Sequence, residues 1–324
     1  MSSLVSLMIP CYNGEKFIDS CLESILAQTY DNVEVVFIND GSKDHTENRI
    51  LEYRTKILNK GYKFIYLHQE NGGAASAINT GLKHISGDYI MLFDVDDILM
   101  NTAIEEKAEF LDNNKEYDMV RNNGYYVNID NLDKVLGVFI ESDSEKKNEH
   151  IFMDLILGKT NNWPSTFMVR TEVLFNHITN KSIYISQYGQ NLQIMLPVSY
   201  YGKSGFIDKP LMKYVKHSKS HSAAENIQKK LELTDGYEKN RIEIINMMDI
   251  DEREKANYIN KINSVYFRIR MDIAYTYRCM DLLKSQYKKL KYMGDATNGD
   301  RLRYYCRIFG VCKIKQYIKK ILIK

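Results

Sequence analysis

The amino-acid sequence predicts an α/β fold, with a parallel, doubly wound sheet in its N-terminal part and a mostly helical region after it. Over about the first 130 residues, short apolar runs typical of strands alternate with segments of helical periodicity. Beyond Ala223, apolar residues recur at spacings of three and four with almost no strand pattern. We therefore expect one domain over residues 1–222 and a helical region over residues 223–324.

The composition excludes several other classes of protein. The chain has 324 residues, of which 44% are hydrophobic and only four are proline, so it can bury a core and is not disordered. No stretch approaches the roughly 18 consecutive apolar residues of a transmembrane helix. The five cysteines form no CxxC pair, which predicts a reduced cytoplasmic chain without a disulfide framework or a zinc site.

Five strands and three helices are expected in the first domain. Helical patterns begin near Asn13 or Gly14, near Asp44 or Thr46, and at Ala74. The expected strands are Val5–Pro10, Val33–Asn39, Lys63–His68, Asp88–Phe93 and Asp118–Arg121 with its tyrosine-rich continuation. From about residue 134 to 150 the chain is charged and weakly patterned, which predicts a mobile or edge segment. Ligands of such sheets bind beyond the carboxyl ends of the strands, so functional residues are expected there.

Two aspartates follow the most apolar of these strands. Asp94 and Asp96 come directly after Tyr89–Phe93, and residues two apart on an extended chain point to the same side. A divalent cation would relieve the repulsion between the two carboxylates, and their hard oxygen ligands favour Mg²⁺ or Mn²⁺. The alternative is a solvated acidic loop, but the position at the end of a buried strand favours a site.

Polar residues also follow the second and third strands. Asp40 precedes Gly41-Ser42 and can accept a hydrogen bond from a nucleobase or a ribose, or it can cap the next turn. The segment Asn71-Gly72-Gly73 precedes a helix and offers backbone N–H groups to phosphate or ribose oxygens, although alone it is only a turn signal. No GxGxxG follows the first strand, so a dinucleotide dehydrogenase is excluded.

Together these motifs resemble the nucleotide-binding half of glycosyltransferase family 2, whose catalytic domain has the GT-A fold. The resemblance is firm over about residues 3–100 and looser to about residue 222. It rests on four motifs in the family's order: Ile9–Glu15, Phe37–Asp44, Glu70–Gly73 continuing through Asn79–Leu82, and Gly87–Tyr89 continuing through Asp94–Asp97. The resemblance implies a GT-A (Rossmann-like) nucleotide-diphospho-sugar transferase domain with a C-terminal helical extension.

The resemblance also implies roles for individual residues. Tyr12 and Asp40 would hold the base of a UDP-sugar, Asp94 would contact the ribose, and Asp96 would bind Mn²⁺ or Mg²⁺. Asp94 and Asp96 are the expected catalytic residues. The full expected nucleotide-binding set is Pro10, Tyr12, Asn13, Glu15, Asp40, Asn71, Gly72, Gly73, Asn79, Asp94 and Val95.

The acceptor side departs from the family's pattern. Similar members place an acidic pair on a helix after the acceptor loop, whereas this chain has Gln190 and Asn191 there. An amide cannot act as the general base, so the base is left unassigned and these two residues are expected to orient the acceptor. Trp163, the only tryptophan, either stacks on an acceptor sugar or packs in the core.

A third metal ligand is expected from the loop that closes the domain. Similar family members use a histidine here, and this chain has His217 and His221 in a loop rich in serine and lysine. His221 is the better match, with His217 as the alternative.

The net charge of +2 conceals a strong asymmetry. Residues 284–324 contain 12 basic and 2 acidic residues, so the remainder of the chain is acidic. A basic, partly apolar tail is typical of an interfacial helix on anionic lipid, and its alternative is a solvated helix packed on the body. No motif for nucleic-acid binding accompanies it. We therefore expect a cytoplasmic protein, peripheral on the inner face of the cell membrane.

The sequence thus predicts a metal-dependent, inverting glycosyltransferase. It would move a sugar from a UDP-sugar to a hydroxyl of a glycan or lipid-linked acceptor in surface polysaccharide synthesis. Two alternatives remain: a nucleotide- or glycan-binding protein of weak activity on the same fold, and a haloacid-dehalogenase-like phosphatase. The phosphatase has its aspartates on the first strand, followed by threonine, whereas here Asp97-Ile98 follows the fourth strand.

Overall fold

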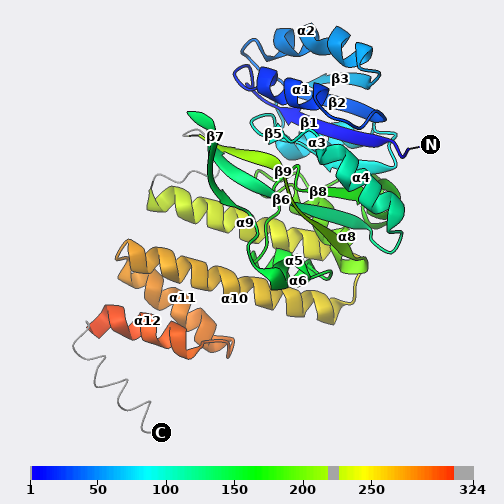
Figure 1. The fold of residues 1–324 in the computed structure, drawn as a ribbon. Helices are drawn as coiled ribbons and strands as arrows, with labels where there is room; N and C mark the ends of the chain where they lie inside the picture. The colour runs from blue at the N-terminus through cyan, green and yellow to red at the C-terminus, as the bar shows by residue number, and fades with distance from the viewer. Residues whose placement is uncertain (1, 218–225, 310–324) are drawn as a thin grey trace. The chain divides into compact units, whose positions relative to one another are not determined.

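The computed structural model describes residues 2–217 and 226–309, and the chain divides into two compact units (Figure 1). The first unit consists of Met1–Ser220 and Met247–Asp249, and the second of His221–Asn246 and Ile250–Lys324. The predicted domain boundary at residue 222 lies outside the described residues.

The first unit is built on one mixed sheet, which has nine strands within the described residues. Its strands are β1 (Val5–Cys11), β2 (Val33–Asp40), β3 (Lys63–Gln69), β4 (Tyr89–Leu92), β5 (Ile98–Leu99), β6 (Met119–Asn128), β7 (Asn131–Val138), β8 (Phe167–Arg170) and β9 (Ser204–Lys216). The order across the sheet is β3-β2-β1-β4-β8-β6-β9-β5, and β7 pairs with β6. Together with the helical C-terminal region, this confirms the predicted α/β class.

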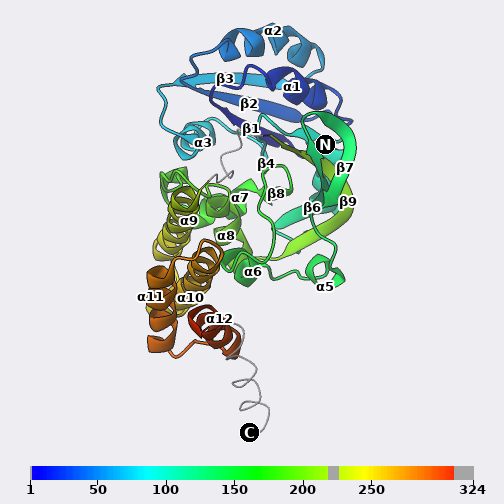
Figure 2. The same cartoon turned by 90° about the vertical axis from the view of Figure 1, so that its left-hand side faces the viewer.

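The parallel half of the sheet is the doubly wound part. Strands β3, β2, β1 and β4 pair in parallel, and every residue of β2 is buried, as expected for a strand covered on both faces. Its helices are α1 (Ile18–Leu26), α2 (Thr46–Asn59) and α3 (Ala74–Leu82). Leu7 and Ile9 share a core with α1 and α2, whereas Met8 on the opposite face of β1 lies against Gly81 of α3. Figure 2 shows α3 on the opposite side of these strands from α1 and α2.

The other half of the sheet is mixed, which the strand–helix alternation did not predict. Strand β8 runs antiparallel to β4 and β6, while β9 runs parallel to β6 and antiparallel to β5. Strand β7 forms a hairpin with β6, and only its residues 134–138 fall in the segment predicted to be mobile or at an edge. The return of β9 beside β5 brings residues near 215 to the residues that follow β4.

Shorter helices complete the first unit, and the second unit is helical. The first unit adds α4 (Ala103–Asn113), α5 (Asp143–Lys146), α6 (Phe152–Ile156), α7 (Thr171–His177), the 3₁₀ turn η1 (Thr179–Lys181) and α8 (Leu192–Tyr201). The other helices are α9 (Ile227–Met247), α10 (Glu252–Thr276), α11 (Met280–Tyr292) and α12 (Asn298–Phe309). Met271, Leu283 and Leu290 form a core between α10 and α11. Among the described residues, no helix combines the length and the apolar composition needed to cross a bilayer.

A buried lysine supports the centre of the first unit. Lys107 of α4 is fully buried, and its Nζ donates to Asn122 Oδ1 at 3.0 Å and to the Ser165 carbonyl at 3.1 Å. Ser165 N–H in turn donates to the carbonyl of Leu92, the last residue of β4. Burial lowers the pKa of Lys107 to about 7, because the charged form is poorly solvated there.

This lysine makes stability depend on pH in a definite direction. Above about pH 7 the folded protein has lost a proton that the unfolded chain keeps up to about pH 10, so the free energy of unfolding rises with pH in this window. Between about pH 7 and about pH 8.5, we expect the unsubstituted protein to gain about 1–2 kcal/mol relative to Lys107→Met. Urea unfolding of both proteins at the two pH values measures this difference. Equal changes in the free energy of unfolding of the two proteins would contradict a lowered pKa of Lys107.

Candidate active site

The carboxyl ends of the first strands lie at one edge of the sheet. Cys11 at the end of β1 pairs with Asn39, and Asp40 at the end of β2 pairs with Gln69, the last residue of β3. The polar segments that follow these strands are therefore brought together, as the sequence predicted from parallel pairing. The side chain of Tyr12, just after β1, is 46% exposed at this edge.

An acidic turn follows β4. The Phe93 N–H donates to the carbonyl of Met8 in β1. The chain then turns, and the Asp97 N–H donates to the Asp94 carbonyl at 3.1 Å. One carboxylate oxygen from each of Asp94, Asp96 and Asp97 lies within 4.8 Å of the others. Asp94 and Asp96 are partly exposed, whereas Asp97 is buried.

The electrostatics of this turn are unfavourable for three charged carboxylates. Burial, followed by the negative charge of Asp96, raises the pKa of Asp94 well above its ordinary value. Burial and the two neighbouring carboxylates raise the pKa of Asp97 in the same direction. Asp97 Oδ2 is buried without a hydrogen-bond partner in the described part of the chain. The orphaned oxygen and the clustered carboxylates together fit a site for a divalent cation of the Mg²⁺ or Mn²⁺ type.

The end of β9 closes the acidic turn. His217 Nε2 lies 2.8 Å from Asp96 Oδ2, and the histidine side chain is only 10% exposed. Its ring also packs against Phe17, with 5.1 Å between the ring centroids. The structure therefore brings together Asp96 and His217, the alternative metal ligand of the sequence analysis, while His221, the preferred one, lies outside the described residues.

Asp40 has a structural task in this arrangement. Its carboxylate accepts the N–H groups of Gly72 and Gly73 at 2.9 and 2.8 Å and the Gln69 side-chain amide at 2.7 Å. The side chain is 3% exposed. The N–H groups of Gly72 and Gly73 thus donate to Asp40 and are not free for a ligand, contrary to the prediction from the sequence. Asp40 thus caps the turn after β3 and not the next turn along the chain, where the Ser42 N–H donates to Asn39 instead.

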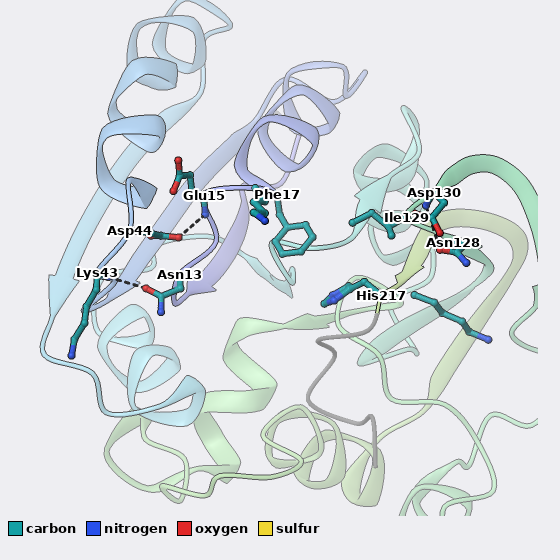
Figure 3. A pocket seen from close by; sticks show the side chains of 11 residues that line it. Asn13, Glu15, Phe17, Lys43, Asp44, Asn128, Ile129, Asp130 and His217 are labelled. Atoms are coloured by element: carbon teal, nitrogen blue, oxygen red, sulfur yellow. Dashed lines mark hydrogen bonds between the residues drawn. The ribbon is translucent and has the colours of Figure 1, made fainter. Parts of the chain in front are cut away.

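The loops after β1 and β2 are tied to each other (Figure 3). Asn13, with φ of 52°, accepts the Lys43 N–H at 2.8 Å, and the Glu15 N–H donates to Asp44 at 3.2 Å. Gly14 lets the loop after β1 lie close to Cys11 and to Val95 of the acidic turn. A Cβ at this position would lie 2.4 Å from Cys11 Sγ and 3.3 Å from the Val95 side chain. The loop after β1 therefore lies against the acidic turn and is hydrogen-bonded to the loop after β2.

A pocket of about 850 Å³ opens beside His217 (Figure 3). It is lined by Asn13, Glu15, Lys16, Phe17, Lys43, Asp44, Asn128, Ile129, Asp130, Lys216 and His217. Two of the expected nucleotide-binding residues, Asn13 and Glu15, therefore belong to its wall. Lys16 and Lys43 form no ion pair with any residue that the structure describes, so their charges are available to an anionic ligand.

Other expected site residues have different surroundings. The side-chain amide of Asn79 exchanges two hydrogen bonds with the backbone of Ile183, at 2.9 and 2.7 Å, which ties α3 to that segment. Trp163 packs among the rings of Tyr126, Phe139 and Tyr214, at centroid distances of 6.0–6.5 Å. These contacts support packing for Trp163, the alternative to stacking on an acceptor sugar.

Gln190 and Asn191 lie where α8 begins. The Gln190 carbonyl accepts the Gln193 N–H, and the Asn191 carbonyl accepts the Ile194 and Met195 N–H groups. Neither residue belongs to the lining of the pocket.

Several residues of the site were not predicted. The hairpin tip Asn128–Asp130 reaches the pocket only because β6 pairs with β9, a long-range pairing without a local sequence signal. Phe17 is part of the apolar pattern of the first helix and gives no sign of its contact with His217. Asp97, in contrast, directly follows Asp96, and its acidity was a usable signal.

Comparison with protein families identifies the class to which this arrangement belongs. Residues 6–176, more than half of the chain, match the model for glycosyl transferase family 2. The chain belongs to glycosyl transferase family 2, a family of transferase enzymes. The matched segment contains the first four strands and the acidic turn after β4.

Curated relatives carry glycosyltransferase names. The glycosyltransferase GlyG of Streptococcus pneumoniae is 31% identical over 187 residues, which are 55% of this chain and 60% of that protein. An uncharacterized glycosyltransferase of Rickettsia typhi is 36% identical over 154 residues, 48% of this chain and 46% of that protein. The matched segments thus span less than two thirds of these relatives.

Solved structures share the fold at low sequence identity. Staphylococcus aureus TarS 1–349 in complex with UDP-GlcNAc has a TM-score of 0.61 and 18% identity, covering 94% of this chain and 87% of TarS 1–349. The mannosyltransferase PcManGT from Pyrobaculum calidifontis, in complex with GDP-Man and Mn²⁺, has a TM-score of 0.58 and 13% identity, with coverages of 95% and 85%. This family 2 chain therefore has the GT-A-like fold that the sequence predicted.

The role of Asp40 gives a direct prediction about stability. Asp40→Asn replaces one of two acceptor oxygens by a donor, which leaves a glycine N–H without its partner. We expect a loss of about 1–3 kcal/mol in the free energy of unfolding, measured by urea denaturation. Glu70→Gln is the matched control, because Glu70 is an exposed residue of the loop after β3 to which Asp40 is bonded. Equal stability of the two variants would contradict the structural role.

Proposed function

We propose that this protein is an inverting, metal-dependent glycosyltransferase that transfers a sugar from a UDP-sugar to a hydroxyl group of a glycan or lipid-linked acceptor. The observation that carries the proposal is the acidic turn of Asp94, Asp96 and Asp97, with His217 against Asp96 and a pocket beside it. Membership of glycosyl transferase family 2 supports the reaction class.

The donor site is proposed at the carboxyl ends of β1, β2 and β4. Tyr12 would stack on the base, and Asp94 would accept a hydrogen bond from the ribose. Asp40 would act on this site indirectly, because it holds the Gly72-Gly73 turn beside it. UDP-GlcNAc bound to a protein of similar fold supports a UDP-sugar as donor, and a GDP-sugar is the comparison to include.

Charge balance is the main task of the proposed site. A divalent cation bound at Asp96 and His217 would neutralise the diphosphate of the leaving nucleotide. Lys16, Lys43 and Lys216 line the adjacent pocket, where their charges would add to the attraction for a diphosphate. Phe17 packs against His217 and limits the positions of its ring.

The acceptor would approach from the opposite side of the donor sugar, as an inverting displacement requires. Gln190 and Asn191 would orient it through their amides, which cannot take the proton of its hydroxyl. We place this reaction in the synthesis of a surface polysaccharide. If the amides mark a loss of turnover, the same fold would instead bind nucleotide or glycan without transfer.

We also propose that the protein works at the inner face of the cell membrane. Within α11, Lys284, Lys288 and Lys291 are exposed and have no acidic partner among the residues described. Tyr292 at the end of α11 is 93% exposed, which suits the polar–apolar boundary of a bilayer. Residues 310–324, which hold much of the basic tail, lie outside the described residues.

Turnover is tested by the release of UDP. With Mn²⁺ and a panel of UDP-sugars, we expect UDP release above the uncatalysed rate, stimulated by glycan acceptors. Asp96→Ala removes the carboxylate that contacts His217, and we expect it to lower release by at least about 100-fold. Asp31→Asn is the matched control, because this aspartate is exposed and precedes β2, at the opposite end of that strand from the acidic turn.

The outcomes separate the candidate functions. Equal UDP release by Asp96→Ala and by the unsubstituted protein would contradict the proposed site. Tight binding of UDP without turnover on any donor and acceptor would support the binding protein instead. Release of GDP from GDP-mannose in place of UDP would change the donor and leave the reaction class unchanged.

Membrane association is tested by co-sedimentation with vesicles. We expect binding to vesicles of phosphatidylglycerol and phosphatidylcholine that weakens with salt and is lost in pure phosphatidylcholine. The triple variant Lys284→Glu, Lys288→Glu, Lys291→Glu should bind at least about tenfold more weakly, since each lysine near the surface contributes about 1 kcal/mol. Lys63, Lys83 and Lys159 are exposed on the first unit, and their triple replacement by glutamate is the control. Equal loss in both triple variants would contradict a role for α11.

A further inference from the structure

Asp97 is the one aspartate of the acidic turn that no proposed step has used. Its side chain is 1% exposed, whereas Asp94 and Asp96 both reach solvent. A buried carboxylate is costly unless its oxygens are satisfied, so its position requires a compensating function.

The first oxygen of Asp97 binds the strand that carries His217. Asp97 Oδ1 accepts the Val215 N–H of β9 at 3.1 Å. The next residue along the chain, Ile98, pairs with Lys213 of β9, so the acidic turn and β9 are joined at adjacent points. His217 follows Val215 by two residues and lies with its Nε2 2.8 Å from Asp96.

The carboxylate of Asp97 also lies close to the other two carboxylates of the turn. Asp97 Oδ2 is buried and has no hydrogen-bond partner among the described residues. One oxygen of this carboxylate belongs to the group that lies within 4.8 Å of the ligand oxygens of Asp94 and Asp96. A cation held by its neighbours would therefore feel the charge of Asp97 across a short, poorly solvated distance.

We propose that Asp97 is a positioning residue of the cation site, which holds His217 against Asp96 through β9 and supplies a third negative charge to the bound ion. This inference rests on the proposed function, because it requires a cation at Asp96 and His217. The Asp97 carboxylate would thus have two tasks: its Oδ1 accepts the Val215 N–H, and its negative charge acts on the bound cation. An asparagine retains the acceptor for Val215 but loses the charge, whereas an alanine loses both.

The experiment measures Mn²⁺ binding to the full chain by the electron paramagnetic resonance signal of free aqueous Mn²⁺. Asp97→Asn should fold normally and bind Mn²⁺ at least about tenfold more weakly, as for other outer-shell carboxylates. Asp97→Ala should bind more weakly still, because β9 is released as well. Asp31→Asn, at an exposed aspartate that precedes β2, should bind as the unsubstituted protein does.

A double-mutant cycle with His217→Ala tests the positioning itself. In the Asp97→Asn background, His217→Ala should lower Mn²⁺ affinity by the same factor as in the unsubstituted protein. In the Asp97→Ala background it should cause no further loss, because His217 is no longer held against Asp96. If Asp97→Ala fails to fold, the affinity of Asp97→Asn decides the proposal.

Three results would overturn the inference. If Asp97→Asn binds Mn²⁺ within about twofold of the unsubstituted protein while Asp96→Ala abolishes binding, the charge of Asp97 has no role and the proposed cation site stands. If His217→Ala lowers Mn²⁺ affinity by the same factor in the Asp97→Ala background as in the unsubstituted protein, positioning of His217 through β9 is excluded. Absence of Mn²⁺ binding by the unsubstituted protein would overturn both this inference and the metal dependence of the proposed function.

Discussion

The repulsion among the three carboxylates after β4 is the constraint on which the rest of the site depends. Asp94, Asp96 and Asp97 are crowded at the end of a buried strand, where solvation is poor. The fold compensates with polar contacts from β9: the Val215 N–H on Asp97 and the imidazole of His217 on Asp96. A cation would complete this compensation, which links the stability of the turn to the proposed chemistry.

The mixed half of the sheet is what makes these contacts possible. A purely parallel sheet would leave the acidic turn open, whereas here β5 pairs with β9 directly after the turn. The parallel pairing of β6 with β9 also brings the hairpin tip at Ile129 toward the pocket that His217 lines. The edge at the carboxyl ends of β1, β2 and β4 and the closing strand β9 are therefore parts of one sheet.

Local patterns predicted the elements whose signals are contained in short segments. Strands β1–β4 and their helices follow from alternating periodicity, and the cluster at Asp94 and Asp96 follows from its place after a buried strand. Pairings between distant segments could not be predicted, because strands β6, β8 and β9 carry no local mark of their neighbours or direction. Asp40 shows the same limit: its type and position were recognised, but its bonds to Gly72 and Gly73 arise from the three-dimensional turn.

The proposed function requires the acidic turn to bind a nucleotide-sugar together with a divalent cation. The most direct measurement is the thermal shift of the full chain with a panel of nucleotide-sugars, with Mn²⁺ and with EDTA. We expect a UDP-sugar to raise the melting temperature by several degrees only when Mn²⁺ is present. An equal rise in EDTA would contradict the roles given to Asp96 and His217.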